Sequence, residues 1–527
     1  MAEKKKWTVM IYLAGNNSLS EECVFALTEM GAAVPSNDVA LVAQLNTGVH
    51  DSTNIRFDKD TSKPEDIHKA LKKALKASSD EEYPKERDNK ERIFRFVEFA
   101  TKNYKAEHYM LVLSGHGSGT VGDFLKDEHP MGKRFSVINL GQLMERINRQ
   151  LLDGNRLDIL GLDSCLMSMT EIAYGIHNHV KIMIGAEGFE PMAGWPYKAI
   201  LKRVNQLPEA EPLAKQIVSE YTKHYTIYQA ANVSVDQAAC DLDQSVDLMK
   251  AINSLAGVLR PRLEQYLEAR QSTLEPATDE ERKQKCINAE LRDALILAHW
   301  EAQLYKNEQY TDLYDFCTLL KNRLSGEEFD HVRKACQNVL NVILGASKHG
   351  EDAKLAAESF TASFFRETRK DKQHFAEHEE LQEFRMRAVD FQNAPGFILK
   401  SCYSGWTVQY SYGVSIYFPW SEVPGELEEY KKLYFARDSG WHDFLDVYLR
   451  ATQREARDKR TQKEITRFRD QFLRPFFNVT ESPIELPFKN GEPNRNGEPN
   501  RSLRNLIGSM KNPPIEFVES LCDPDER

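Results

Sequence analysis

Five apolar runs alternate with helical patterns over the first 190 residues, and this alternation constrains the fold most strongly. The runs are apolar almost throughout rather than at every second position, which is typical of parallel strands covered on both faces. They lie at residues 7–14, 38–45, 108–114, 157–163 and 180–186. Between them, apolar residues recur at helical spacing. The pattern predicts an α/β fold with a mostly parallel sheet flanked by helices, whose ligands bind beyond the carboxyl ends of the strands.

Two of these runs end in a reactive side chain. His116 follows one run between Gly115 and Gly117, and Cys165 follows the next run along the chain. A thiol and an imidazole at neighbouring strand ends suit cysteine-dependent acyl transfer. We expect Cys165 in the first turn of a helix, where the dipole favours a thiolate. We also expect the N–H groups of Gly117 and Cys165 to bind an oxyanion.

Other interpretations of these residues stay open at this point. A lone cysteine at a strand end is more often inert core, and one histidine between glycines is a weak signal. A metal centre would need more ligands than His116 and Cys165 supply, and His177 and His179 have the wrong spacing to share a helix face. A nucleotide site would need a phosphate loop, and neither GxGxxG nor GxxxxGK[ST] follows a predicted strand.

The remaining chain is less regular. A further strand is predicted at 232–242, and another at Tyr412–Pro419 suggests that the chain returns to the sheet. A tandem Asn-Gly-Glu-Pro-Asn-Arg repeat predicts a flexible linker at about 489–502, followed by a short tail. We expect a catalytic domain, a mainly helical accessory region, a return to the sheet plus a helix, and a charged C-terminal extension, at residues 1–245, 246–395, 396–450 and 451–527.

Composition limits the partners and the compartment. The net charge of −11 argues against a general nucleic-acid or anionic-membrane binder, and the apolar runs are too short to span a bilayer. The stretch after Lys4–Lys6 is short and has no small-residue cleavage site behind it. The eight cysteines are scattered without CxxC spacing, as in reduced cytosolic proteins. We expect a cytoplasmic protein with neither nucleic acid nor membrane as a partner.

Seven motifs in order give the chain its family resemblance. It resembles the clostripain-like cysteine peptidases, relatives of caspases, gingipains and legumains, from about residue 7 to about residue 448. Seven ordered motifs are more specific than any one of them. They are Trp7-Thr-Val-Met-Ile-Tyr-Leu-Ala-Gly-Asn-Asn, Ser114-Gly-His-Gly-Ser-Gly, Asp163-Ser-Cys-Leu-Met, Glu190-Pro-Met-Ala-Gly-Trp-Pro-Tyr, Asp312-Leu-Tyr-Asp-Phe, Gly413-Val-Ser-Ile-Tyr-Phe-Pro and Trp441-His-Asp-Phe-Leu.

The resemblance implies a caspase-like sheet and a cysteine endopeptidase acting through a Cys165 thioester, with His116 as general acid and base. It implies cleavage of protein substrates after Arg or Lys, with the Asp163 carboxylate meeting the cation. The alternative for Asp163 is a purely structural role, as a carboxylate that stabilises a helix N-terminus. The substrate-binding residues implied are Asp163, Glu190, Ala193 and Trp195. The chemistry requires no cofactor; calcium is possible because some relatives depend on it, although no EF-hand-type loop is present.

Three positions depart from the family pattern, which usually has Asp at Ala193, Asp at Asn16 and Trp at Thr120. None of them touches the dyad, so they bear on specificity more than on activity. The Asp at position 193 looks like a second acid of the substrate pocket in relatives. Losing it should weaken the preference for a cation, or shift it to whichever basic residue Asp163 reaches alone.

Family members are commonly precursors that are cut in a loop after the histidine strand. In this chain the loop at 121–136 contains Lys126, Lys133 and Arg134 as candidates for autocleavage, although it also fits an ordinary solvated loop. We expect a zymogen restrained until an activating protease, self-cleavage or a regulatory protein acts. The alternative function is a catalytically silent scaffold that binds partners, and retention of both dyad residues argues against it.

Overall fold

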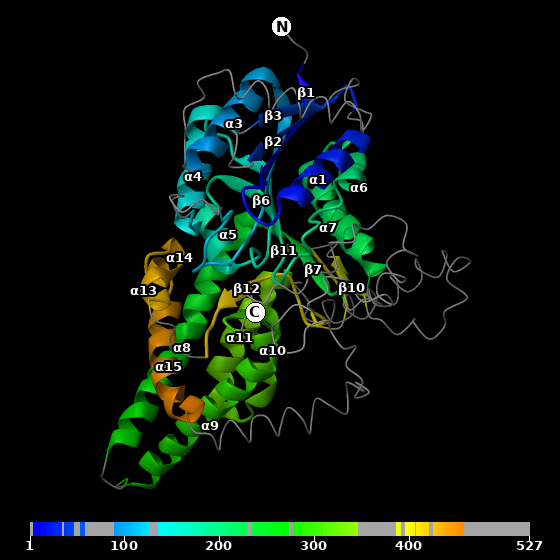
Figure 1. Cartoon of the computed structure of the whole chain (residues 1–527). Helices are drawn as coiled ribbons and strands as arrows, with labels where there is room; N and C mark the ends of the chain where they lie inside the picture. Colours follow the sequence, from blue (N-terminus) through cyan, green and yellow to red (C-terminus); the bar gives the residue numbers. More distant parts are fainter. Residues whose placement is uncertain are drawn as a thin grey trace, which may run out of the picture.

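The computed structural model shows a central sheet between two layers of helices, with a helical lobe below it (Figure 1). It describes residues 4–33, 36–46, 53–57, 89–126, 135–228, 233–272, 276, 278–306, 308–345, 386–390, 396–405, 407–420 and 425–457.

Within the described ranges, the central sheet has nine strands in the order β10-β11-β7-β6-β5-β4-β1-β2-β3. The inner strands β2, β1, β4, β5 and β6 are parallel, and antiparallel strands are added at both sides. The sheet is therefore mostly parallel at its centre, as expected. The strands are β1 Lys5–Ala14, β2 Val39–Asn46, β3 Thr53–Phe57, β4 Ala106–Ser114, β5 Leu157–Asp163, β6 Val180–Gly185, β7 Val235–Asp241, β10 Met386–Asp390 and β11 Ile398–Ser404.

Each face of the sheet has its own apolar core. Along β1, Met10 and Tyr12 pack into the core formed with α3 (Asn89–Asn103), α4 (Val137–Leu151) and α5 (Thr170–Ile176). Val9 and Ile11 pack into the opposite core, formed with α1 (Ser20–Ala33), α6 (Tyr197–Val204) and α7 (Ala210–Thr226). Successive side chains of a strand point to opposite faces, so burial on both faces requires the continuous apolar runs seen in the sequence.

The helical lobe is assembled from two distant parts of the chain. Its first part contains η3 Leu242–Gln244, α8 Ser245–Gln271, α9 Asp279–Glu301, α10 Leu313–Arg323, η4 Glu327–Phe329 and α11 Asp330–Leu344. Its second part contains α13 Glu426–Tyr430, α14 Tyr434–Asp438 and α15 Trp441–Arg457. A small sheet, β12-β9-β8, joins them; it consists of β8 Leu304–Tyr305, β9 Tyr310–Asp312 and β12 Ser415–Tyr417.

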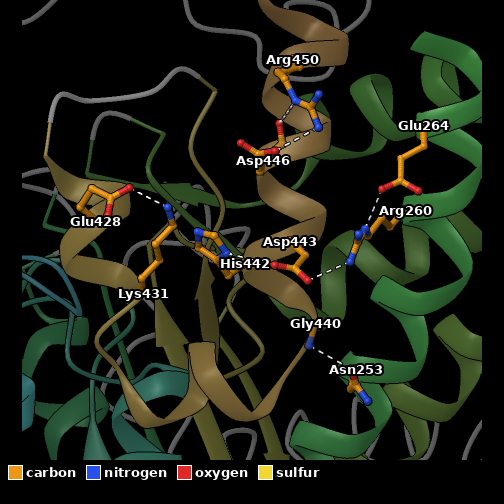
Figure 2. A network of polar contacts seen from close by, with 10 residues as sticks. All are labelled: Asn253, Arg260, Glu264, Glu428, Lys431, Gly440, His442, Asp443, Asp446 and Arg450. Atoms are coloured by element: carbon orange, nitrogen blue, oxygen red, sulfur yellow. Dashed lines mark hydrogen bonds and ion pairs between the residues drawn. The ribbon is translucent and has the colours of Figure 1, made fainter. Parts of the chain in front are cut away.

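Helix α15 is attached to this lobe at its first turn and along its surface. The buried indole of Trp441 donates to the carbonyl of Tyr417 in β12 at 2.9 Å. Figure 2 shows Arg260 of α8 bonded to Asp443 of α15 at 2.8 Å, and Asn253 accepting the N–H of Gly440 at 2.9 Å. The buried anchor thus joins α15 to β12, and the exposed polar contacts join the start of α15 to α8. In the described part of the chain, no helix is long and apolar enough to cross a membrane.

One expected strand pairs elsewhere. The run at Tyr412–Pro419 contains only the short β12, which pairs with β9 in the small sheet. The chain rejoins the central sheet through β11, which pairs with β7. Because β7 has β6 on one side and β11 on the other, its ladder has no free edge for a further strand.

Candidate active site

The register of the central sheet brings the two predicted reactive residues to one edge. Ser114 at the end of β4 is paired with Asp163 at the end of β5. His116 and Cys165 each follow two residues later, so they leave the sheet at the same level. At Gly117 a Cβ atom would lie 2.2 Å from the carbonyl oxygen of Cys165, which only a glycine avoids. The structure therefore places the histidine loop directly against the backbone of the cysteine.

The thiol of Cys165 is half-buried and is held by the loop that follows β6. The N–H of Glu190 donates to the sulfur at 3.3 Å, and the carbonyl oxygen of the same residue lies 3.7 Å from it. A backbone N–H aimed at the sulfur stabilises a thiolate more than a thiol. This contact joins the nucleophile to the segment that carries the substrate-binding motif.

The helix expected to begin at Cys165 is absent there, so that prediction is wrong. Helix α5 begins at Thr170, and Leu166 adopts a left-handed φ of 63°. The N–H groups of Leu166 and Ser168 donate to the carbonyls of Gly188 and Ala186, at 2.9 and 2.8 Å. The segment after β5 therefore pairs with the loop after β6 instead of coiling. The helix dipole cannot act on the thiol, nor can Asp163 serve as a carboxylate at a helix N-terminus.

The imidazole of His116 has a partner that the sequence did not reveal. The hydroxyl of Ser18 lies 2.9 Å from Nε2, while the backbone carbonyl of His116 accepts the N–H of Leu125 at 2.8 Å. Ser18 belongs to the turn between β1 and α1. The available signal was positional, because residues that follow parallel strands leave the sheet at the same edge. The structure adds that β1 is paired with β4, which brings the residues after the two strands together.

Asp163 is buried, with 4% of its surface exposed, and faces the substrate-binding motif. Tyr197 donates its hydroxyl proton to Oδ2 at 2.6 Å, and a Cβ at Gly194 would lie 2.9 Å from both carboxylate oxygens. Burial raises the pKa of Asp163, and hydrogen bonds from Tyr197, Ser114 and Glu190 oppose this increase. The carboxylate is therefore desolvated and held by hydroxyl and carboxyl donors.

Glu190 is the partner that shares a proton with Asp163. Its Oε1 accepts hydrogen bonds from Nε2 of Gln237 at 3.1 Å and from Nε1 of Trp195 at 3.4 Å. Burial and then the nearby charge of Asp163 raise the pKa of Glu190 well above its usual range. Among the residues that the structure describes, no donor bonds its Oε2, as expected if this oxygen carries the shared proton. The pair then carries one negative charge, located mainly on Asp163.

The other two residues of the predicted pocket, Trp195 and Ala193, pack against the central sheet and its apolar core. The ring of Trp195 packs on β5, where a Cβ at Gly161 would lie 2.7 Å from it. Ala193 is partly buried against the core on that face and supplies no charge. Asp163, Glu190 and Trp195 are thus brought together, and Ala193 lies next to Gly194 at the edge of the group.

A second group of buried carboxyls lies directly behind the substrate loop. Asp236 accepts the N–H groups of Glu187 and Gly188, at 2.7 and 2.9 Å, and burial raises its pKa to about 6. Glu187 accepts the N–H of Gly413 at 2.6 Å, and burial raises the pKa of Asp312 to about 8. Glu187 and Asp312 share a proton: burial, and then the charges of Asp312 and Asp236, raise the pKa of Glu187 well above its usual range.

These carboxyls do not fit a calcium site. Their oxygens are taken up by backbone N–H groups and by the shared proton, whereas calcium needs six to eight free oxygen ligands. Over the residues that the structure describes, no group of three or more His, Cys, Asp or Glu side chains could hold a metal ion. The catalytic chemistry of a cysteine peptidase requires no cofactor.

The predicted processing loop is only partly described. The carbonyl of Lys126 accepts Nδ2 of Asn17 at 2.8 Å, and the N–H of Phe124 donates to Phe135 across the loop at 2.9 Å. Lys133 and Arg134 lie outside the described residues. Lys126 is therefore placed one residue from Leu125, which is bonded to the backbone of His116.

The family model of the clostripain family, Peptidase_C11, matches residues 11–447. The chain belongs to this family. It is a cysteine peptidase, as predicted, and the family implies protein substrates. No curated protein sequence gives a significant match.

Solved structures of clostripain-family proteins resemble this peptidase. A secreted C11 cysteine protease from Bacteroides thetaiotaomicron, bound to an irreversible peptide inhibitor, is 15% identical over 83% of this chain and 99% of its own, with a TM-score of 0.49. An inactive zymogen C11 protease from Parabacteroides distasonis is 17% identical over 83% and 99%, with a TM-score of 0.48. The secreted B. thetaiotaomicron protease iotapain is 12% identical over 83% and 100%, with a TM-score of 0.49.

The cytoplasmic location expected from the sequence is contradicted, because two of these similar proteins are secreted proteases. The expectation depended on scattered, unpaired cysteines. In the structure Cys23, Cys240, Cys317 and Cys336 are buried free thiols. Buried thiols of this kind act as small apolar side chains in either compartment, so their lack of pairing does not report the redox environment.

Proposed function

We propose that this clostripain-family peptidase is an endopeptidase that cleaves protein substrates after Arg or Lys through a Cys165 thioester. The observation that carries the proposal is the buried Asp163 carboxylate, two residues before the nucleophile at the end of β5. A desolvated carboxylate attracts a cation more strongly than an exposed one does. A P1 side chain that extends from a carbonyl at Cys165 toward Asp163 would meet this charge.

In the proposed reaction the Cys165 thiolate attacks the scissile carbonyl carbon. The N–H groups of Gly117 and Cys165 stabilise the oxyanion. His116 donates a proton to the departing amine as the C–N bond breaks, leaving the thioester. Water then attacks the thioester, His116 takes its proton, and the sulfur leaves as thiolate to restore the enzyme. The close contact of Gly117 with the Cys165 backbone supports this assignment of the oxyanion donors.

We assign the substrate pocket to Asp163, Glu190, Ala193 and Trp195. The protonated Glu190 limits the pocket to one negative charge, so it suits one monovalent cation. Ala193 offers no second charge, and Asp163 alone has to select the substrate. Because guanidinium can bind a carboxylate through two parallel hydrogen bonds, Arg should be preferred to Lys.

We infer that the enzyme is made as a zymogen and activated by a cut at Lys126, Lys133 or Arg134, by itself or by another protease. The hydrogen bond from Leu125 to the His116 carbonyl links the start of this loop to the catalytic histidine. A cut after Lys126 would separate the rest of the loop from Leu125, whose N–H is bonded to the His116 carbonyl. A regulatory protein that binds the loop could act through the same contact.

The test uses fluorogenic peptides with Arg, Lys, Asp or Leu at P1, with the wild type and Cys165→Ala. We expect turnover of the Arg and Lys peptides by the wild type alone, with and without calcium. No turnover and no self-cleavage, even after limited nicking in the 121–136 loop, would contradict the proposed peptidase activity. Preference for an uncharged P1 residue would refute the role of Asp163 and leave the dyad in place.

A further inference from the structure

The turn between β1 and α1 lies against the catalytic histidine. Leu13 in β1 is level with Ser114 in β4, so this turn leaves the sheet at the same edge as His116. The hydroxyl oxygen of Ser18 lies 2.9 Å from His116 Nε2, within hydrogen-bond distance. The contact joins residues 98 positions apart, so it depends on the tertiary fold.

The turn is held rigidly on both sides of Ser18. The side chain of Asn17 is buried; its Nδ2 donates to the carbonyls of Ala14 and Lys126 at 3.0 and 2.8 Å. Its Oδ1 accepts the N–H of Leu19 at 2.9 Å. Asn17 therefore fixes the backbone around Ser18 to the end of β1 and to the loop after His116. Ser18 itself is exposed.

A neutral imidazole carries one N–H and one basic nitrogen, and the partner of one nitrogen decides the role of the other. A serine hydroxyl can accept an N–H and does not itself titrate near neutral pH. With Nε2–H donated to Ser18, Nδ1 is left as the basic nitrogen. The ring is also held against rotation about its χ2 angle, so Nδ1 keeps one direction.

We propose that Ser18 is a positioning residue that holds His116 with Nδ1 available to Cys165. Nδ1 takes the thiol proton to give thiolate and imidazolium, and later passes that proton to the amine nitrogen as the C–N bond breaks. The Nε2 proton stays on the nitrogen, bonded to Ser18, throughout. The proposal rests on the proposed function for the identity of the leaving amine. The effect of Ser18 on the Cys165 thiol does not depend on any substrate.

The experiment compares Ser18→Ala and Ser18→Thr with the wild type in full-length protein. Because water can replace the exposed hydroxyl in part, we expect Ser18→Ala to lower kcat by about tenfold with KM unchanged. The rate of Cys165 alkylation by iodoacetamide at pH 7 should fall by a similar factor. Ser18→Thr, which keeps the hydroxyl, should restore most of both rates. Ser20→Ala, the same change at the exposed start of α1, is the matched control.

Two results would overturn the proposal. One is a Ser18→Ala enzyme with the kcat and alkylation rate of the wild type. The other is a higher KM with both rates unchanged, which would make Ser18 a substrate contact. A wild type that reacts with iodoacetamide but cleaves no peptide would refute the proposed function alone, because the alkylation rates would still decide the role of Ser18.

Discussion

Carboxyl groups have opposite environments in two regions of this peptidase. Around the active site, Asp163 and Glu190 are buried and share a proton, and Glu187 and Asp312 do the same behind the substrate loop. Between α8 and α15, Asp443 pairs with Arg260, and their side chains are 57% and 43% exposed (Figure 2). Buried charge is costly and directional, whereas exposed pairs are screened by water and salt. The first region should therefore decide function and pH response, and the second should contribute little.

The largest expected effect is on substrate choice. Asp163→Asn keeps the shape of the side chain and removes its charge, so we expect kcat/KM for Arg peptides to fall by about 100-fold. Cleavage of a Leu peptide should change little. Steady-state kinetics on both peptides provide the measurement, with the exposed Asp443→Asn as the matched control. An equal loss on both peptides would show that Asp163 supports the fold of the site instead of selecting P1.

The next effect concerns stability against pH. The pKa of Asp312 is raised from 3.8 to about 8 by burial, so the folded protein holds a proton that the unfolded chain releases. This contribution to stability is complete below pH 3.8 and is lost as the pH rises to about 8. Glu171 and Asp236, with pKa values raised by burial to about 7 and about 6, add to the same trend.

We therefore expect the free energy of unfolding to fall between pH 5 and pH 8. Asp312→Asn should reduce this fall by about 2 kcal/mol, since asparagine cannot titrate and still caps α10. Urea unfolding at the two pH values gives the measurement. A pH dependence unchanged by the substitution would mean that Asp312 titrates normally in the folded state.

The smallest effect is expected at the exposed pair. A double-mutant cycle with Arg260→Ala and Asp443→Ala should give a coupling energy below about 1 kcal/mol, which 1 M salt removes. Thermal or urea unfolding of the four proteins measures it. A coupling energy above about 2 kcal/mol would contradict the expectation that the exposed pair contributes little. It would show that the contact between α8 and α15 stabilises the lobe strongly.

The sequence predicts the central sheet well because burial on both faces requires long apolar runs, and β5 is found with the expected bounds, Leu157–Asp163. It also predicts that His116 and Cys165 follow neighbouring parallel strands at one edge of the sheet, as the pairing of β4 with β5 shows. It misplaces the helix after Cys165, since the hydrogen bonds that prevent coiling come from residues 186 and 188, supplied by another loop. Ser18 is missed for a related reason: an exposed serine in a turn looks like any solvated residue until the fold supplies its partner.

The pairing of Ser114 with Asp163 has a consequence for how the dyad tolerates change. Each strand residue advances the chain by about 3.3 Å and turns the side chain to the other face. One residue inserted in β4 or β5 would thus separate thiol from imidazole and point one of them away. Insertions in the loops farther along would leave the register of β4 and β5 unchanged. The register of β4 and β5 therefore sets the relative positions of the thiol and the imidazole.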